Sequence, residues 1–203
     1  WNMKHTAYHH KNLRNELIEK GIELVEEYGM QQLSLRKVAQ ACNVSHAAPY
    51  SHFKNKDDLI LAMQSYITDQ FTERLQDVIA KHSGKPEFLM EFGKAYVLFF
   101  LQNPHYFSFL FTKGKMQINL DNQGESDEDY KPFSIYKKQV MKLLAPLELS
   151  EEKKQDYIIA LFAYIHGLTS LATLQNVRYA SDWEEKIEDL ICTFSIGNEV
   201  VSC

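Results

Sequence analysis

Hydrophobic residues recur every three to four positions along most of this chain, the spacing of one face of an α-helix. In the first helix Leu17, Ile18, Ile22 and Val25 share a broad apolar face, and glutamates occupy other faces. Helices are predicted up to about residue 28 and then over about 34–42, 46–53, 57–81, 88–102, 106–111, 132–144, 150–175 and 182–196. No segment alternates in the manner of a strand, so the pattern predicts an all-α protein.

The stretch from Ser34 to Lys56 is predicted to form two short helices joined by a tight turn. Ser34 is a good N-cap for the first of them, and Ser45 is placed to cap the second. Asn43 lies between them, and Asn tolerates the positive φ angle that such a turn requires. Pro49 falls in the first turn of the second helix, where a missing N–H costs least.

A helix that enters the major groove of DNA needs short polar side chains near its N-terminus. Ser45, His46, Ala47 and Ser51 fit that description and are candidates for reading bases. Tyr50, His52 and Lys56 are candidates for phosphate contacts, which set the register and give most of the affinity. Lys37 and the backbone N–H groups that follow Ser34 could hold a further phosphate. A helix, turn and helix also occurs in proteins that never bind DNA, so the evidence lies in the combination.

From about Leu13 to Met63 the chain resembles the DNA-binding domain of the TetR family of bacterial regulators. The resemblance rests on Tyr50-x-His52-Phe53, on Lys56 at the start of the next helix, and on Tyr28-Gly29 before Leu33-Ser34-Leu35. It implies a three-helix, helix-turn-helix DNA-binding domain over 1–56 and a helical effector-binding and dimerisation domain over 57–203. Ile165-His166-Gly167 is similar to the Trp-His-Gly triplet of one subgroup, with Ile165 replacing Trp.

Charge shows where nucleic acid could bind. Residues 1–60 hold eight Lys and Arg against seven Asp and Glu, a net charge of +1. The remainder has a net charge of −6, which brings the whole chain to −5. DNA binding must therefore depend on a local basic patch. Three Cys form no close-spaced pair, which favours a reducing cytoplasm. The apolar stretch from Tyr157 to Leu174 is short for a membrane span, and Trp1-Asn2 before Met3 could be a cloning remnant.

Aromatic residues are concentrated in the middle of the chain, where the TetR resemblance implies a small-molecule pocket. An apolar or aromatic effector fits such a lining. Aromatic residues at helical spacing are more often plain core, and His166 could be a ligand anchor, a helix–helix hydrogen-bonding group or a satisfied core histidine. The candidate effector-binding residues are Tyr96, Phe99, Phe100, Phe107, Phe111, Tyr136, Met141, Tyr164 and His166.

A homodimer is expected because one short reading helix contacts few base pairs, and two copies match a palindromic operator. The last two helices are predicted to form the interface through a stripe at helical spacing. A monomer that uses both helices in its own core is the alternative. The candidate interface residues are Leu168, Leu171, Trp183, Ile187, Leu190, Ile191 and Phe194.

These features predict a ligand-responsive regulator, most simply a repressor, whose effector moves the helix that starts at Asp57 and thereby changes the spacing of the two DNA-reading heads. No phosphate loop, metal-spaced Cys or His cluster or nucleophile elbow points to an enzyme, and neither a metal nor a cofactor is expected. The His5, His9 and His10 group is only a weak metal candidate. The rival function is a helical protein-interaction adaptor, which would tolerate loss of Tyr50 and Lys56.

Overall fold

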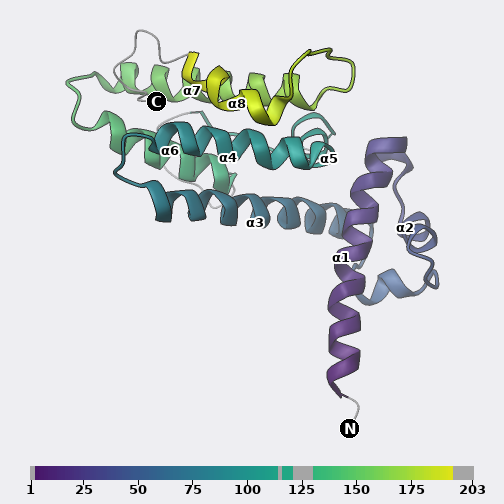
Figure 1. Ribbon diagram of the computed structural model, residues 1–203. Helices are drawn as coiled ribbons and strands as arrows, with labels where there is room; N and C mark the ends of the chain where they lie inside the picture. Colours follow the sequence, from purple (N-terminus) through teal and green to yellow (C-terminus); the bar gives the residue numbers. More distant parts are fainter. Residues whose placement is uncertain (1–2, 114–115, 121–129, 194–203) are drawn as a thin grey trace. The chain divides into compact units, whose positions relative to one another are not determined.

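The computed structural model describes residues 3–113, 116–120 and 130–193, and within them every regular element is helical (Figure 1). Trp1, Asn2 and Phe194 therefore lie outside the described residues, as do the side chains of His5, His9 and His10. The elements are α1 (Met3–Tyr28), η1 (Met30–Gln32), α2 (Leu35–Ala41), η2 (Ala48–Ser51), α3 (Lys56–His82), α4 (Phe88–Gln102), α5 (Pro104–Phe107), the π-helical η3 (Ser108–Lys113), α6 (Lys131–Leu144), α7 (Glu151–Thr173) and α8 (Trp183–Thr193).

The chain divides into two compact units, one of residues 1–69 and 108–115 and the other of residues 70–107 and 116–203. The division falls inside α3, which begins in the first unit and continues into the second. The sequence placed the domain boundary at residue 56, where α3 begins. The first unit extends past that boundary because the first turns of α3 pack their apolar side chains, among them Leu59 and Met63, into its core.

The first unit is built on the apolar face of α1. Leu17, Ile18 and Val25 are fully buried, as is Val38 on α2. A Cβ atom at Gly21 would lie 3.0 Å from the sulfur of Met63, which shows how closely α3 approaches α1. Cys42 ends α2 and its thiol donates a hydrogen bond to the carbonyl oxygen of Glu16, 3.6 Å away. This packing fixes the segment that follows α2.

In the second unit, α4 packs against both α7 and α8 (Figure 1). Met90 and Val97 of α4 form a core cluster with Ile187 and Ile191 of α8, and Ile165 and Leu168 of α7 pack against it. A salt bridge from Lys94 to Glu188, at 2.6 Å, also joins α4 to α8. Helix α6 packs against α7. These four helices, together with the second half of α3, frame the cavity described below.

The caps follow the sequence closely. The Ser34 hydroxyl accepts a hydrogen bond from Lys37 N, and the Ser150 hydroxyl accepts one from Lys153 N. The Asp182 carboxylate accepts from Glu185 N, and α8 begins at the next residue. Helix α4 has the predicted bounds. The predicted short helix over 106–111 is instead α5 followed by the π-helical η3.

Candidate functional site

The turn after α2 has the predicted conformation. Asn43 has a φ angle of 54°, and it is the only non-glycine residue with positive φ among those described. The backbone N–H of Val44 reaches back to the carbonyl of Ala39, at 3.0 Å, and satisfies an acceptor at the end of the helix. The chain therefore leaves α2 sharply and starts a new segment at Ser45.

The segment from Ser45 to Phe53 differs from the predicted α-helix. Its backbone bonds are mostly of the i to i−3 type: Ala48 N to Ser45 O at 3.0 Å, Tyr50 N to Ala47 O at 3.1 Å and His52 N to Pro49 O at 2.9 Å. They form turns and one short 3₁₀ helix, η2. Pro49 explains the difference, because it has no N–H to donate to Ser45 in an α-helical bond.

The side chains of this segment divide into an exposed set and an anchor. Phe53 is 2% exposed and Pro49 is buried, so these two hold the segment to the unit. His52 is half-buried beside Phe53, with ring centroids 6.2 Å apart, which places it less openly than a phosphate contact was expected to be. The remaining candidates Ser45, His46, Ala47, Tyr50 and Ser51 are all exposed.

Two lysines follow this segment and have different surroundings. Lys56 Nζ donates a 2.7 Å hydrogen bond to the carbonyl of Met30 and is half-buried, so the structure gives it a role in tying α3 to η1. Lys54 is exposed, and its backbone N–H is held by Asp58 at 2.8 Å. The sequence reasoning chose Lys56 for phosphate and missed Lys54, although Lys54 directly follows the buried Phe53 and a side chain there has to point outward.

On α2, Ser34 is half-buried and Lys37 is exposed. Lys37 Nζ lies 2.9 Å from the side-chain oxygen of Gln32. Lys37 and Lys54 are exposed cations that lie before and after the Ser45–Phe53 segment in the sequence, and we call this segment the reading segment.

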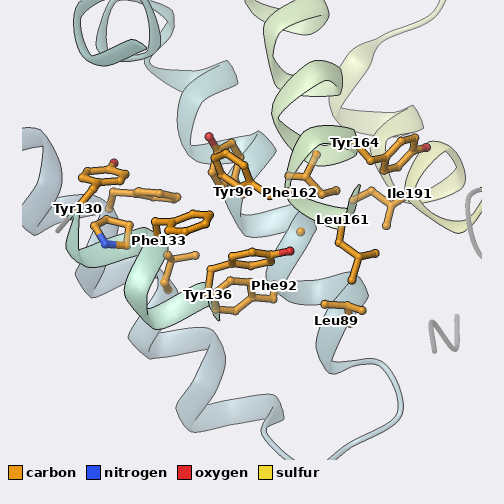
Figure 2. A pocket seen from close by; sticks show the side chains of 15 residues that line it. Leu89, Phe92, Tyr96, Tyr130, Phe133, Tyr136, Leu161, Phe162, Tyr164 and Ile191 are labelled. Atoms are coloured by element: carbon orange, nitrogen blue, oxygen red, sulfur yellow. The ribbon is translucent and has the colours of Figure 1, made fainter. Parts of the chain in front are cut away.

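The second unit contains an apolar cavity of about 50 Å³ (Figure 2). Tyr130 and Phe133 lie toward one end of it in this view, and α3, α4 and α7 also supply side chains to its lining. Tyr164 and Ile191, from α7 and α8, lie together at the other end in this view. The lining residues are Phe71, Leu75, Leu89, Phe92, Gly93, Tyr96, Tyr130, Pro132, Phe133, Tyr136, Leu161, Phe162, Tyr164, Ile165 and Ile191.

Three of the predicted effector residues, Tyr96, Tyr136 and Tyr164, line the cavity, and each uses its hydroxyl to tie helices together. Tyr96 is 3.0 Å from His166 Nδ1, Tyr136 donates to Ile158 O at 2.6 Å, and Tyr164 donates to Leu190 O. Burial raises the pKa of all three phenols. The neutral phenol is therefore the form that lines the cavity.

The other predicted effector residues lie outside the lining. Phe99 and Phe100 pack on Phe71, each with ring centroids 4.9 Å from it. Phe107 packs against His166 at 5.1 Å, so both stand in the layer behind Tyr96. Phe111 belongs to η3 in the first unit, and Met141 of α6 does not line the cavity. Burial lowers the pKa of His166.

Sequence reasoning missed most of the lining because it followed aromatic clusters and not helix faces. Phe92 lies four residues before Tyr96, and Ile165 lies four residues after Leu161. The two residues of each pair therefore lie on the same face of their helix, and that face lines the cavity. Phe71 and Leu75 of α3 form a third such pair. This spacing is the signal that could have identified them.

The predicted dimer residues are divided between core and surface. Ile187 and Ile191 are 0% and 5% exposed within the subunit, so they have no surface left for a partner, and α8 turns this stripe toward α4. Leu171 is 50% exposed, whereas Leu168, Trp183 and Leu190 are half-buried.

Two further observations concern the remaining expectations. No helix among the described residues, including α7 with its apolar stretch, is long and apolar enough to cross a membrane. Cys42 is a free thiol.

Comparison with known proteins identifies the class. Residues 17–63, which contain α2, the turn at Asn43 and the reading segment, match the family model for bacterial regulatory proteins of the tetR family. The first unit therefore contains a DNA-binding region of the tetR type, and the similar proteins described below are named as regulators. The subgroup with the Trp-His-Gly triplet gains no support from these comparisons.

Similar proteins include one with a stated role. The Fatty acid metabolism regulator protein of Bacillus subtilis (strain 168) is 25% identical over 119 residues, which cover 58% of this chain and 60% of that protein. The chain thus spans less than two thirds of that curated relative.

Among solved structures, the fatty acid degradation regulator FadR from Bacillus halodurans has a TM-score of 0.67 at 13% identity, with 91% of this chain and 98% of that chain covered. A TetR/AcrR-family regulator from Thermobifida fusca has a TM-score of 0.61 at 18% identity, with 93% and 99% covered. At these identities the structural likeness shows the fold alone.

Proposed function

We propose that this protein is a ligand-responsive transcriptional repressor that acts in the cytoplasm, binds a palindromic operator as a homodimer and leaves it when an apolar effector enters the second unit. The observation that carries the proposal is the exposed segment after Asn43, inside the region that matches the TetR family. An adaptor that binds only protein would not need this segment to be polar and exposed.

Base reading would fall to the exposed residues of the segment. Ser45, His46 and Ser51 can donate or accept hydrogen bonds at base edges, and Ala47 can contact a thymine methyl group. Tyr50, which is 61% exposed, and the cations Lys37 and Lys54 suit phosphate oxygens. The Lys56 ammonium group has donors beyond the one that bonds to Met30 O, so it can also contact a DNA phosphate while it holds α3 in place.

Dimerisation would use the exposed face of α7. This face carries no charge from Ala160 to Leu174 and consists of small and apolar residues: Ala160, Ala163, Gly167, Leu171 and Leu174. Leu171 and Leu174 are each 50% exposed. Burial of these side chains against a second copy of the chain would stabilise a dimer. The small residues would let two α7 helices approach closely.

A substitution at Gly167 tests this face without damage to the subunit. A Cβ atom there would meet nothing within 4 Å, so Gly167→Arg adds a charge to the stripe and no clash inside the protomer. Sedimentation should show a dimer for the wild type and for the control Ala80→Arg, an exposed site on α3, and a monomer for Gly167→Arg. A dimer for Gly167→Arg would count against the α7 interface.

The effector would be an apolar compound. None of the fifteen described residues that line the cavity is charged, and two relatives are named for fatty acid metabolism or degradation. A hydrocarbon of the fatty acid type therefore fits both the lining and the relatives.

Helix α3 would transmit the signal. Its Phe71 and Leu75 line the cavity. Its first turn is fixed by two hydrogen bonds: Lys56 donates to Met30 O, and the Asp58 carboxylate accepts from the backbone N–H of Lys54 just after the Ser45–Phe53 segment. A ligand that displaces Phe71 favours a different position of α3, and it shifts the DNA-binding equilibrium only by its preference for that position.

A mobility-shift assay on the DNA that flanks the protein's own gene tests the function directly. We expect the wild-type protein to retard this DNA specifically and to release it when fatty acid is added. The Tyr50→Ala variant should fail to retard the DNA even in the absence of ligand. Retardation that no apolar compound changes at saturating occupancy would contradict the ligand response. Failure to bind any operator in a selection from random duplexes would contradict DNA binding itself.

A further inference from the structure

The lining of the cavity restricts the chemistry of what can be buried there. An ionised group would find no opposite charge among the described lining residues, and an uncompensated buried charge is strongly disfavoured. Of the four lining tyrosines, Tyr96, Tyr136 and Tyr164 have their hydroxyls bonded to His166, Ile158 and Leu190, so these three rings offer the cavity mainly carbon. The buried part of a ligand is therefore hydrocarbon.

The size of the cavity restricts its shape. A cavity of about 50 Å³ is far below the roughly 300–1,000 Å³ of pockets that enclose a whole drug-sized molecule. A slender, flexible chain can enter by small rotations of the surrounding rings. A fused aromatic system would have to displace several rings at once, including Phe71, which is stacked on Phe99.

One tight contact lies in the wall of this narrow cavity, between α4 and α7 and next to Ile191 at one end of the lining. Gly93 has no side chain, and Ile165 fills the space above it: a Cβ atom at position 93 would lie 3.0 Å from Ile165 Cδ1 and 3.6 Å from Ile191 Cδ1. Both Gly93 and Ile165 line the cavity, so a change of side-chain size at either position changes the lining itself. Ile191 belongs to the buried core with Ile187, which leaves Ile165 as the residue that can vary.

We propose that the cavity binds an unbranched hydrocarbon chain and that Ile165, seated on Gly93, sets the length of chain that it accepts. This inference rests on the proposed apolar effector site and specifies its ligand. The Ile165 side chain acts as the stop, because it occupies the volume into which a longer chain would extend. Substitutions at this position should change chain-length preference in a direction given by side-chain size.

The test measures binding of saturated straight-chain fatty acids of increasing length to the full-length protein by calorimetry. Ile165→Ala removes three carbons, so its preferred ligand should be longer by about two or three methylenes, whereas Ile165→Phe should prefer a shorter one. Each CH₂ group of the ligand that can no longer be buried in the cavity should weaken binding about four-fold, which corresponds to roughly 0.8 kcal/mol per buried CH₂.

Two controls separate ligand selection from general damage. Leu168→Ala removes a side chain from the same core cluster that does not line the cavity, so it should lower stability and leave the length profile unchanged. Gly93→Ala with Ile165→Val moves one carbon from α7 to α4 and relieves the 3.0 Å contact, so this double variant should keep the wild-type profile.

The outcomes are distinguishable. Chains that bind with a profile that is the same in wild type, Ile165→Ala and Ile165→Phe would overturn the role of Ile165 and leave the apolar effector site standing. A fused aromatic compound that binds more tightly than every chain would overturn the chain-shaped ligand. If no chain binds any variant, while the protein still retards its operator, both the inference and the apolar effector are wrong.

Discussion

Lys54 and Lys56 lie two residues apart, and the structure predicts different consequences for stability when each is replaced by Met. Met keeps most of the length of the side chain and removes the ammonium group. Lys56 donates to Met30 O at 2.7 Å and is half-buried, so Lys56→Met should lower the free energy of unfolding by about 1 kcal/mol, the size of one net hydrogen bond. Lys54 is exposed, and Lys54→Met should leave stability unchanged.

DNA binding should respond in the complementary way. If Lys54 contacts a phosphate in each half of a dimer, its loss removes two contacts per complex. The slope of log K against log salt concentration should then become shallower by about 1.8, because each neutralised phosphate contributes about 0.9. The loss should be similar for operator and unrelated DNA, since phosphates carry no sequence.

Urea unfolding and salt-dependent fluorescence anisotropy, run on the same two variants, decide the matter. An unchanged salt slope in Lys54→Met would refute its place on the phosphates. An unchanged unfolding free energy in Lys56→Met would refute the structural role of the Met30 contact.

Three further predictions concern other parts of the molecule. Asn43→Gly should keep or raise stability and Asn43→Ala should lower it by about 1 kcal/mol in urea unfolding, because φ is positive there; equal stability of the two would argue against the strain. Tyr136→Phe removes the bond to Ile158 O and should reduce stability by about 1 kcal/mol in the same assay; unchanged stability would argue against a stabilising role of that bond. Because burial lowers the pKa of His166, the unfolded chain binds more protons near and below the ordinary value of 6.5, so stability should decrease as the pH falls through that range. His166→Gln should show a smaller decrease, and an identical pH profile would contradict this.

The elements that local chemistry controls were predictable from the sequence. The caps at Ser34, Ser150 and Asp182, and the positive φ at Asn43, each depend on one side chain and its immediate backbone. The bounds of α4 follow in the same way from Pro86 before it and Asn103-Pro104 after it. Such features need no knowledge of the tertiary structure.

The candidate sites were less predictable because they depend on which face of a helix turns inward. On α4, Tyr96 faces the cavity while Phe99 and Phe100 pack on Phe71, and nothing in their composition separates them. On α8, Ile187 and Ile191 are buried in the core of the protomer, whereas Trp183 and Leu190 of the same stripe are only half-buried. The reading segment departed from a helix because one missing N–H, at Pro49, decided between two bonding patterns.

The thiol of Cys42 gives the first unit a built-in reporter of its own opening. It is half-buried between α1 and α2, it is hydrogen-bonded to Glu16 O, and burial raises its pKa, so reaction with an alkylating reagent should be slow while α2 stays docked. The rate at which mass spectrometry finds this cysteine modified would therefore measure how often α2 detaches, with and without operator DNA, and no label has to be introduced.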